Sequence, residues 1–187
     1  MPTIENLYFI AVIPSEKISA EITAFKQDIA NRFESRASLK VLSHITLKAP
    51  FKLHGEEHEG LLKWFRELPV SREAFTLKLK GFGSFPNKNS PVIFVHPEPN
   101  PVFHSLQKEI IASFKKAFPS IIMMAPDWKF NPHMTIAYKD LSPEFFPEAW
   151  SEYQSKLYEE NMQVNSFFLL QHDRRKWNII EEFVLNT

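Results

Sequence analysis

The sequence predicts an α+β fold of two lobes, each with an antiparallel or mixed sheet backed by helices. One observation is that the order strand, helix, strand, helix, strand occurs twice along the chain. Another is a four-residue pattern of His, apolar, Thr, apolar that occurs once in each half, at residues 44–47 and 133–136. Because side chains alternate between the two faces of a strand, the His and Thr of each pattern should project together. We expect these faces to line a cleft between the lobes.

The length of the chain favours a single domain. With 187 residues, of which 44% are hydrophobic and 18 are Phe, the chain can bury about 70% of its unfolded surface. We expect one domain over residues 1–187, built of two intertwined lobes that correspond approximately to residues 1–86 and 87–187.

The composition excludes several classes of function. The 22 basic and 22 acidic residues cancel, so the molecule offers no general field for a long polyanion, and a nucleotide ligand should be short or bound locally. Only 4 Gly are present, which argues against a glycine-rich phosphate loop. The absence of Cys excludes disulfides, thiolate metal sites and cysteine nucleophiles.

Elements of the first half follow from apolar patterns and proline positions. A β-forming apolar run ends at Pro14, and Ser15 can cap a following helix whose apolar residues recur every three or four positions. The strand with the first pattern should end at Pro50. The strand expected over residues 75–80 should end at the glycine-containing segment 81–86. The expected elements are a strand over 7–13, a helix over 15–33, a strand over 44–49, a helix over 57–68 and a strand over 75–80.

The second half repeats this order. Pro143 suits the first turn of a helix, which we expect to continue to about residue 160. A polar turn at residues 173–176 should join the last two strands. The expected elements are a strand over 92–95, a helix over 101–118, a short strand over 121–124, the second pattern strand over 131–138, a helix from 143 and strands over 164–171 and 177–185.

Two histidines and two hydroxyls that face one space suit the cleavage of a phosphodiester. Histidine, with an ordinary pKa near 6.5, can take a proton from the attacking oxygen or give one to the leaving oxygen at neutral pH. The hydroxyls of Thr46 and Thr135 can donate hydrogen bonds to the non-bridging phosphate oxygens. This chemistry requires no metal or other cofactor.

Two further residues are candidates for substrate binding. Lys48 has the parity of His44 and Thr46, so it should add a positive charge to the same face, unless it is an ordinary exposed strand residue. Phe130 precedes the second pattern and could stack on a nucleobase, although most aromatic side chains in this chain should belong to the core.

The paired patterns, the strand and turn over residues 9–14 and the Asn131-Pro132 dipeptide resemble those of the 2H phosphoesterase superfamily, whose bacterial members are called 2′-5′ RNA ligase-like proteins. The resemblance covers nearly the whole chain, in order. It implies a bilobal fold with pseudo-twofold symmetry and a water-filled cleft. It also implies activity on 2′,3′-cyclic phosphate ends, on related cyclic nucleotides or on 2′-5′-linked oligonucleotides.

On this resemblance His44 and His133 are the acid–base pair, and Thr46 and Thr135 bind the phosphate. We therefore expect a metal-independent cyclic phosphodiesterase that acts on an RNA end or a small nucleotide. One alternative is a module that binds such a ligand without turning it over. Another is a 2′-5′ RNA ligase or transesterase that works without ATP. The sequence contains neither an ATP-binding lysine motif nor a P-loop, which favours hydrolysis over ligation.

The sequence gives weaker expectations about surroundings and partners. The only apolar run near the N-terminus, residues 7–14, is too short for a membrane span and follows no basic segment, so we expect a cytoplasmic protein without membrane attachment. No metal site is expected: His54 and His58 have a four-residue spacing, but Gly55 stands where a metalloprotease helix has Glu. We expect a monomer with no obligate protein partner.

Overall fold

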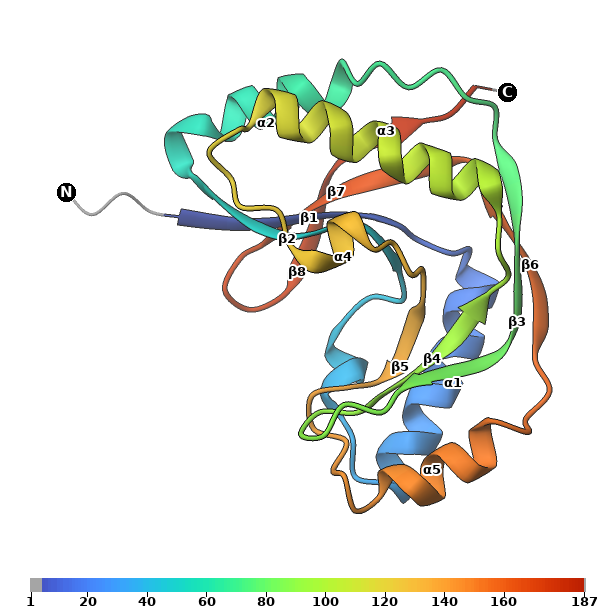
Figure 1. The fold of residues 1–187 in the computed structure, drawn as a ribbon. Coiled ribbons are helices and arrows are strands. Elements are labelled where there is room, and N and C mark those ends of the chain that lie inside the picture. Colours follow the sequence, from blue (N-terminus) through green and yellow to red (C-terminus); the bar gives the residue numbers. More distant parts are fainter. Residues whose placement is uncertain (1–4, 187) are drawn as a thin grey trace.

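A computed structural model describes residues 5–186 and contains two four-stranded sheets (Figure 1). The strands are β1 (Glu5–Val12), β2 (Ile45–His54), β3 (Phe75–Phe85), β4 (Val92–Pro97), β5 (Met134–Ala137), β6 (Glu159–Val164), β7 (Ser166–His172) and β8 (Trp177–Val184). The α-helices are α1 (Glu16–Arg32), α2 (His58–Arg66), α3 (Pro101–Ala117), α4 (Ala125–Trp128) and α5 (Phe146–Tyr153), and the 3-10 helices are η1 (Ala37–Lys40) and η2 (Gly55–Glu57).

The two sheets have equivalent architectures. One has the strand order β2-β1-β7-β8 and the other the order β5-β4-β3-β6, with antiparallel pairing between neighbours. The unit β1-α1-β2 in the first sheet corresponds to β4-α3-β5 in the second, and each unit ends on the strand that carries a His-apolar-Thr-apolar pattern. The prediction of a two-lobed α+β fold is confirmed, because each sheet is backed by helices and forms one lobe of the molecule (Figure 1).

Neither sheet is confined to one half of the chain. The strands β7 and β8 join β1 and β2, and β3 joins the strands of the other sheet, so the sheets do not follow the boundary expected near residue 86. The long helices are also exchanged: α1 connects β1 to β2 but packs against β5, and α3 connects β4 to β5 but packs against β2 (Figure 1). Each lobe is therefore completed by a helix from the unit of the other.

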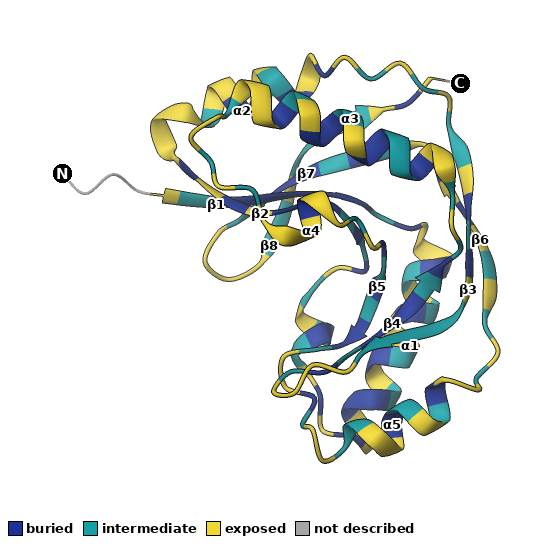
Figure 2. Cartoon of the chain, viewed as in Figure 1, coloured by how far each residue is buried: buried dark blue, intermediate teal, exposed yellow. Residues whose placement is uncertain are grey.

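The long helices α1 and α3 begin where the sequence indicates and turn one face to the sheets. Ser15 Oγ accepts a hydrogen bond from the backbone N–H of Ile18 at the start of α1, and Asn100 Oδ1 accepts one from Phe103 at the start of α3. Both helices present a buried face to the sheets and an exposed face to solvent (Figure 2).

Two expected strand ends are wrong. β2 continues through Pro50, which is tolerated there because β2 is an edge strand and its pairing with β1 shifts register between Lys48 and Phe51. β3 likewise continues through Gly81, whose φ of 63° allows an extra residue in the pairing with β4. In both cases a bulge absorbs the residue that was expected to break the strand.

Two other expected elements also differ. Residues 121–124 form no strand and instead lead into the short helix α4. The helix expected from Pro143 to about residue 160 extends only from Phe146 to Tyr153, and the last part of that segment belongs to the edge strand β6. β6 has only two buried residues, Met162 and Val164, which is too weak a pattern to reveal a strand.

Candidate active site

His44 is the residue immediately before β2. Its Nδ1 lies 2.7 Å from the carbonyl oxygen of Leu42, and its ring packs on Phe9 of β1 at a centroid distance of 4.9 Å. A carbonyl can only accept, so Nδ1 carries the proton and the neutral ring presents its lone pair at Nε2.

His133 has the same arrangement in the other lobe. It immediately precedes β5, and its Nδ1 lies 2.8 Å from the carbonyl oxygen of Asn131. Its ring packs against Phe85 and Phe94, at centroid distances of 5.0 and 5.3 Å. Both histidines are therefore held by the carbonyl two residues earlier and by aromatic rings from other strands of the same sheet, and Nε2 is the nitrogen left without such a partner.

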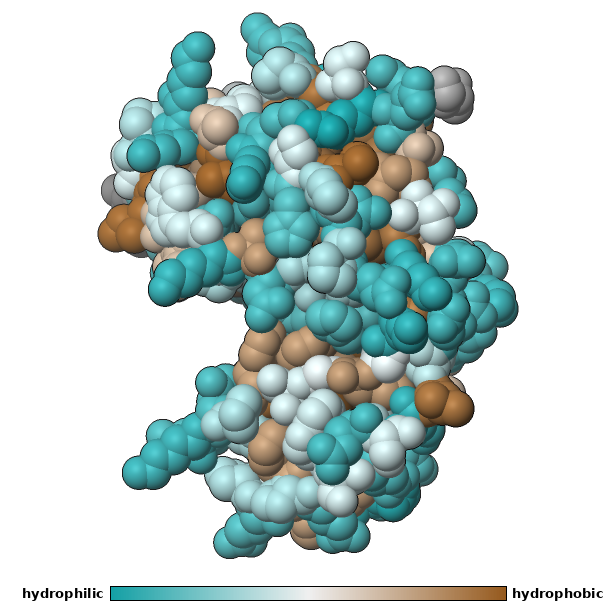
Figure 3. Space-filling model, turned by 45° about the vertical axis from the view of Figure 1, so that its right-hand side comes forward, coloured by the Kyte–Doolittle hydropathy of each residue, from teal (hydrophilic) through white to brown (hydrophobic). Residues whose placement is uncertain are grey.

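One pocket brings the two patterns together. His44 and Thr46 from the first pattern and Thr135 from the second line a cavity of about 200 Å³, and His133 lies two residues before Thr135 on the same face of the chain. The surface is hollowed between the two lobes (Figure 3). The full lining is Phe9, Lys26, Ser38, Val41, Leu42, His44, Thr46, Pro50, Thr135, Tyr138 and Trp177.

Burial shifts the pKa of both histidines. It lowers the pKa of His44 to about 4, and the nearby charges of Lys26 and His133 act in the same direction, against the opposing hydrogen bond to the Leu42 carbonyl. Burial also lowers the pKa of His133, again against the hydrogen bond to a carbonyl. Both rings are therefore neutral at pH 7 in the free protein.

Lys48 does not share the face of His44 and Thr46, so that expectation is wrong. Thr46 pairs with Ala11, but Lys48 pairs with the next residue back along β1, Ile10. The extra residue between them is a β-bulge, which turns Lys48 from the cleft face to the core face. There its side chain is completely buried.

The second pattern contains the same bulge. Thr135 pairs with Phe94, and Ala137 pairs with Ile93, so one extra residue again follows the Thr. Ala137 stands where Lys48 stands in the first pattern, and it too is fully buried. The position two residues after each Thr is thus a core position in both lobes.

An ion pair compensates for the burial of Lys48. Its Nζ lies 3.0 Å from Oδ2 of Asp127 in α4 and donates to the carbonyl of Ala49 at 3.1 Å. The two oxygens of Asp127 also accept the backbone N–H groups of Ala49 and Met124, at 2.9 and 2.8 Å. The pKa of Lys48 is lowered overall, because the effect of burial exceeds the opposing effect of the hydrogen bond to Asp127. Lys48 is thus a structural residue that ties β2 to α4.

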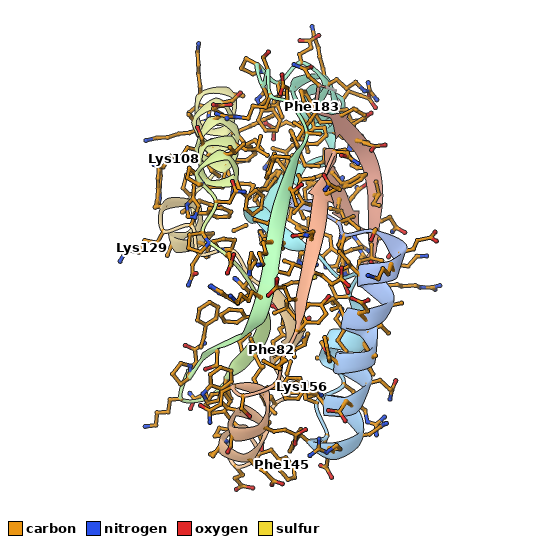
Figure 4. The ribbon with its side chains drawn as sticks, turned by 90° about the vertical axis from the view of Figure 1, so that its right-hand side faces the viewer. Phe82, Lys108, Lys129, Phe145, Lys156 and Phe183 are labelled. Carbon is orange, nitrogen blue, oxygen red and sulfur yellow. The ribbon has the colours of Figure 1, made fainter. Side chains whose placement is uncertain are left out.

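Phe130 lies outside the histidine pocket. It lines a different hollow of about 490 Å³, formed by α3, α4 and the segment after α4, and its ring packs against Phe103 and His104. Lys108 and Lys129 also line this hollow and lie along the same edge of the molecule (Figure 4). The expected stacking role at the histidines therefore has no support from the position of Phe130.

Two polar residues of the pocket were not recognised from the sequence. Lys26 of α1 is only 3% exposed and Ser38 of η1 only 1%, yet both line the pocket. Lys26 could have been noticed, because it lies four residues after Ile22 and three before Ile29, within the apolar stripe of its helix. Ser38 gave no such signal.

Neither a cluster of metal ligands nor a membrane-spanning helix occurs in the described part of the chain. In residues 5–186, no three side chains of His, Cys, Asp or Glu come together in a way that could hold a metal ion. No helix in the same range combines the length and the hydrophobicity needed to span a bilayer.

Comparisons with known proteins give consistent results. A family model described as the 2′-5′ RNA ligase superfamily matches residues 14–176. The chain is 29% identical over 184 residues to a Bacillus licheniformis protein named "Putative phosphoesterase", and this match covers 96% of the chain and 99% of that protein.

Solved structures share the fold. A protein of Thermus thermophilus is 21% identical with a TM-score of 0.66, covering 95% of this chain and 97% of that one. E. coli LigT, in a crystal structure with 3′-AMP, is 15% identical to this chain. The two structures superpose with a TM-score of 0.69, and the match covers 98% of this chain and 100% of LigT. At these sequence identities, the similarity shows a shared fold.

Proposed function

Because the chain belongs to the 2′-5′ RNA ligase superfamily, the 2H phosphoesterases, we propose that it is a metal-independent phosphodiesterase that opens cyclic phosphates. The substrates would be RNA ends with a 2′,3′-cyclic phosphate or related small cyclic nucleotides. The observation that carries the proposal is the meeting of both His-apolar-Thr-apolar patterns at one pocket, each His held through Nδ1 so that Nε2 is left for the substrate.

In the proposed reaction, water attacks the phosphorus in line with the oxygen that leaves. One imidazole Nε2 takes the proton of the water, and the other imidazole, protonated, gives its proton to the departing ribose oxygen. The bond from phosphorus to that oxygen breaks, and the product is a phosphomonoester. The hydroxyls of Thr46 and Thr135 donate to the non-bridging oxygens, on which charge increases in the transition state.

The low pKa values of the two histidines fit this scheme once substrate is bound. A general acid must be protonated, whereas burial keeps both rings neutral in the free protein at pH 7. A phosphate anion beside the rings favours the charged imidazolium, so substrate binding would raise the pKa of one imidazole. That ring would then take up the proton that it gives to the leaving oxygen. Substrate would thus help to prepare the acid.

The size of the pocket supports recognition of a nucleotide end. Its volume of about 200 Å³ is below the roughly 300–1,000 Å³ of sites that enclose a whole small molecule. Such a pocket would hold the phosphate and leave the base at the rim. E. coli LigT has been crystallised with 3′-AMP, a nucleotide with a terminal phosphate, which is consistent with this class of ligand.

The test uses an oligoribonucleotide that ends in a 2′,3′-cyclic phosphate, incubated with purified protein in EDTA. Ring opening to a phosphomonoester is expected. His44→Ala and His133→Ala should each reduce turnover by about 10²–10⁴-fold, the usual contribution of one positioned acid or base. His54→Ala is the matched control, because His54 is exposed and does not line the pocket.

Other outcomes would replace the proposal. Binding of the oligonucleotide without any product at saturation would indicate a recognition module. A joined product from two RNA halves without ATP would indicate a ligase or transesterase. Full activity in either histidine variant would exclude the assigned roles.

A further inference from the structure

Lys26 is a buried cation without a carboxylate partner. It lies on α1 with 3% of its surface exposed, and its Nζ donates one hydrogen bond, to the carbonyl of Val41 at 2.9 Å. Across residues 5–186, no carboxylate lies within ion-pair distance of this Nζ. A buried ammonium is costly unless its charge and its three donors are satisfied, so two of its donors remain for another group.

Ser38 is a second unsatisfied polar group in the same wall. It is 1% exposed, and its Oγ has no hydrogen-bond partner among the described residues. Both Lys26 and Ser38 line the pocket that also contains His44, Thr46 and Thr135. A buried hydroxyl without a partner is rare in proteins and calls for an explanation.

The pocket otherwise lacks positive charge at neutral pH. Of its lining residues in the described part of the chain, Lys26 is the only Lys, Arg, Asp or Glu. The rings of His44 and His133 are neutral at pH 7 because burial lowers their pKa values. A dianionic transition state in this pocket would meet two neutral imidazoles, two threonine hydroxyls and one ammonium.

We propose that Lys26 and Ser38 form an anion subsite on the wall made by α1 and η1, and that its ligand is the phosphate group of the substrate. Lys26 Nζ donates to a non-bridging oxygen of the phosphate and supplies the positive charge, and Ser38 Oγ donates a second hydrogen bond. The two threonines approach the phosphate from β2 and β5, so the subsite adds a third wall to the phosphate site. This inference rests on the proposed function for the identity of the ligand.

The charge of Lys26 should make phosphate binding depend on pH. Burial lowers the pKa of Lys26 to about 8. The titratable groups that line its pocket with it are His44 and Tyr138, and the charge of His133 acts on His44. Burial and the nearby Asp140 raise the pKa of Tyr138, and both histidines are already neutral above pH 7. Loss of phosphate affinity between pH 8 and pH 10 would thus report on Lys26.

The test is calorimetric binding of inorganic phosphate to the purified full-length chain. Lys26→Met keeps the apolar stem and removes the charge, so phosphate affinity at pH 7 should fall about 10- to 100-fold, the effect of losing one charged hydrogen bond. Ser38→Ala should lower it by about 3- to 10-fold. Wild-type affinity should decrease above pH 8, and this decrease should be absent in Lys26→Met.

Lys17→Met is the matched control, because Lys17 lies on the same helix but pairs with Glu160 at the surface, and it should bind phosphate like wild type. A merely structural Lys26 would give the opposite result, with a lower melting temperature and unchanged phosphate affinity and pH dependence. If Lys26→Met does not fold, Ser38→Ala and the pH dependence of wild type decide. Unchanged affinity in Ser38→Ala together with no loss of wild-type binding above pH 8 overturns the proposal.

The two proposals can fail separately. Phosphate binding that depends on Lys26, without turnover of a cyclic phosphate, would support the anion subsite and exclude the proposed hydrolysis. Turnover that depends on His44 and His133, together with phosphate binding that does not change in Lys26→Met, would support the proposed hydrolysis and exclude the anion subsite.

Discussion

The tautomers of His44 and His133 are set locally, and the relation between the two rings is set by the fold. Each Nδ1 bonds to a carbonyl only two residues away, at Leu42 or Asn131. This contact involves no other part of the molecule, because both partners lie in the same short segment. The meeting of the two His-apolar-Thr-apolar patterns at one pocket depends on two different sheets, which no local pattern describes.

The burial of His44 predicts a loss of stability in acid. Its pKa is about 4 in the folded protein and near 6.5 when exposed, so the unfolded chain binds more protons between these values. Stability is therefore complete above pH 6.5 and falls as the pH falls toward 4. His44 should contribute a loss of about 2 kcal/mol between pH 7.5 and pH 5. Urea unfolding of wild type and His44→Gln at both pH values measures this.

His54→Gln serves as the reference in that experiment, because His54 is exposed and should leave the acid-dependent loss unchanged. His133 contributes in the same direction as His44, so His44→Gln should reduce the loss without abolishing it. An equal acid-dependent loss of stability in wild type and His44→Gln would contradict the lowered pKa of His44.

The buried pair of Lys48 and Asp127 predicts an asymmetry between its two partners. Asp127→Ala leaves the ammonium buried without a counter-charge and should destabilise the protein by about 3–5 kcal/mol. Lys48→Met should cost less, because the carboxylate keeps the N–H groups of Ala49 and Met124 as donors. Chemical unfolding of both variants tests this order. The double variant should be more stable than the sum of the single effects predicts, and strict additivity would contradict the coupling.

Lysines show where sequence reasoning reached its limit at this scale. Parity along a strand placed Lys48 in the cleft, whereas a bulge of one residue placed it in the core. Lys26 was passed over although it interrupts the apolar stripe of α1, because a single charged residue in such a stripe is usually solvated at its edge. The alanine at the position equivalent to Lys48 in the second pattern was the one sequence signal for a core position.

At the scale of elements, the bulge after Thr46 is supported by neighbouring helices. The extra residue of a bulge leaves a backbone group outside the ladder. In β2 this residue is Leu47, and its carbonyl accepts a hydrogen bond from Nε2 of Gln107 in α3, at 3.3 Å. The same Nε2 donates to the carbonyl of Asp127. One buried glutamine thus links the bulge to both α3 and α4.

A glycine in β3 makes room for the aromatic ring that supports His133. A Cβ added to Gly83 would lie 2.4 Å from the ring of Phe94, which packs on His133 at 5.3 Å. Gly83→Ala should therefore displace Phe94 and reduce the turnover of a cyclic phosphate by about 10- to 100-fold, as expected for a misplaced acid or base. Steady-state kinetics measures the loss of turnover, and chemical unfolding shows whether the substitution also changes the stability of the protein.

Gly60→Ala is the matched substitution without a neighbour. Gly60 lies in α2, and apart from its chain neighbours and the backbone of its own helix no heavy atom of the described residues is within 4 Å of an added Cβ. Alanine there should raise stability by about 0.5–1 kcal/mol and leave turnover unchanged. Full activity in Gly83→Ala would show that Phe94 does not position His133.

The elements themselves follow unevenly from the sequence. Those with a strong apolar period, such as α1, α3 and β7, lie close to the expected ranges. β6 was missed because an edge strand with charged residues carries little apolar pattern; Glu159 and Lys78 form an ion pair there instead. The expected ends at Pro50 and Gly81 failed because bulges and edge positions tolerate both residue types.

At the scale of the molecule, the duplication was predictable and the exchange was not. Each strand-helix-strand unit is continuous in the chain, so its order can be recognised from patterns of adjacent residues. The packing of α1 on β5 and of α3 on β2 depends on which apolar faces meet in three dimensions. The sequence halves therefore gave the right number of lobes and the wrong membership for β3, β7 and β8.

This exchange predicts that the lobes unfold together. If one sheet lost its structure, the helix packed on the other sheet would lose its flanking strands. A variant that keeps only Trp64, in α2 on the first lobe, and one that keeps only Trp150, in α5 on the second, should show the same urea midpoint by fluorescence. That midpoint should also match far-UV circular dichroism. Separate midpoints for the two reporters would mean that the lobes are independent folding units and that residues 1–187 are not a single domain.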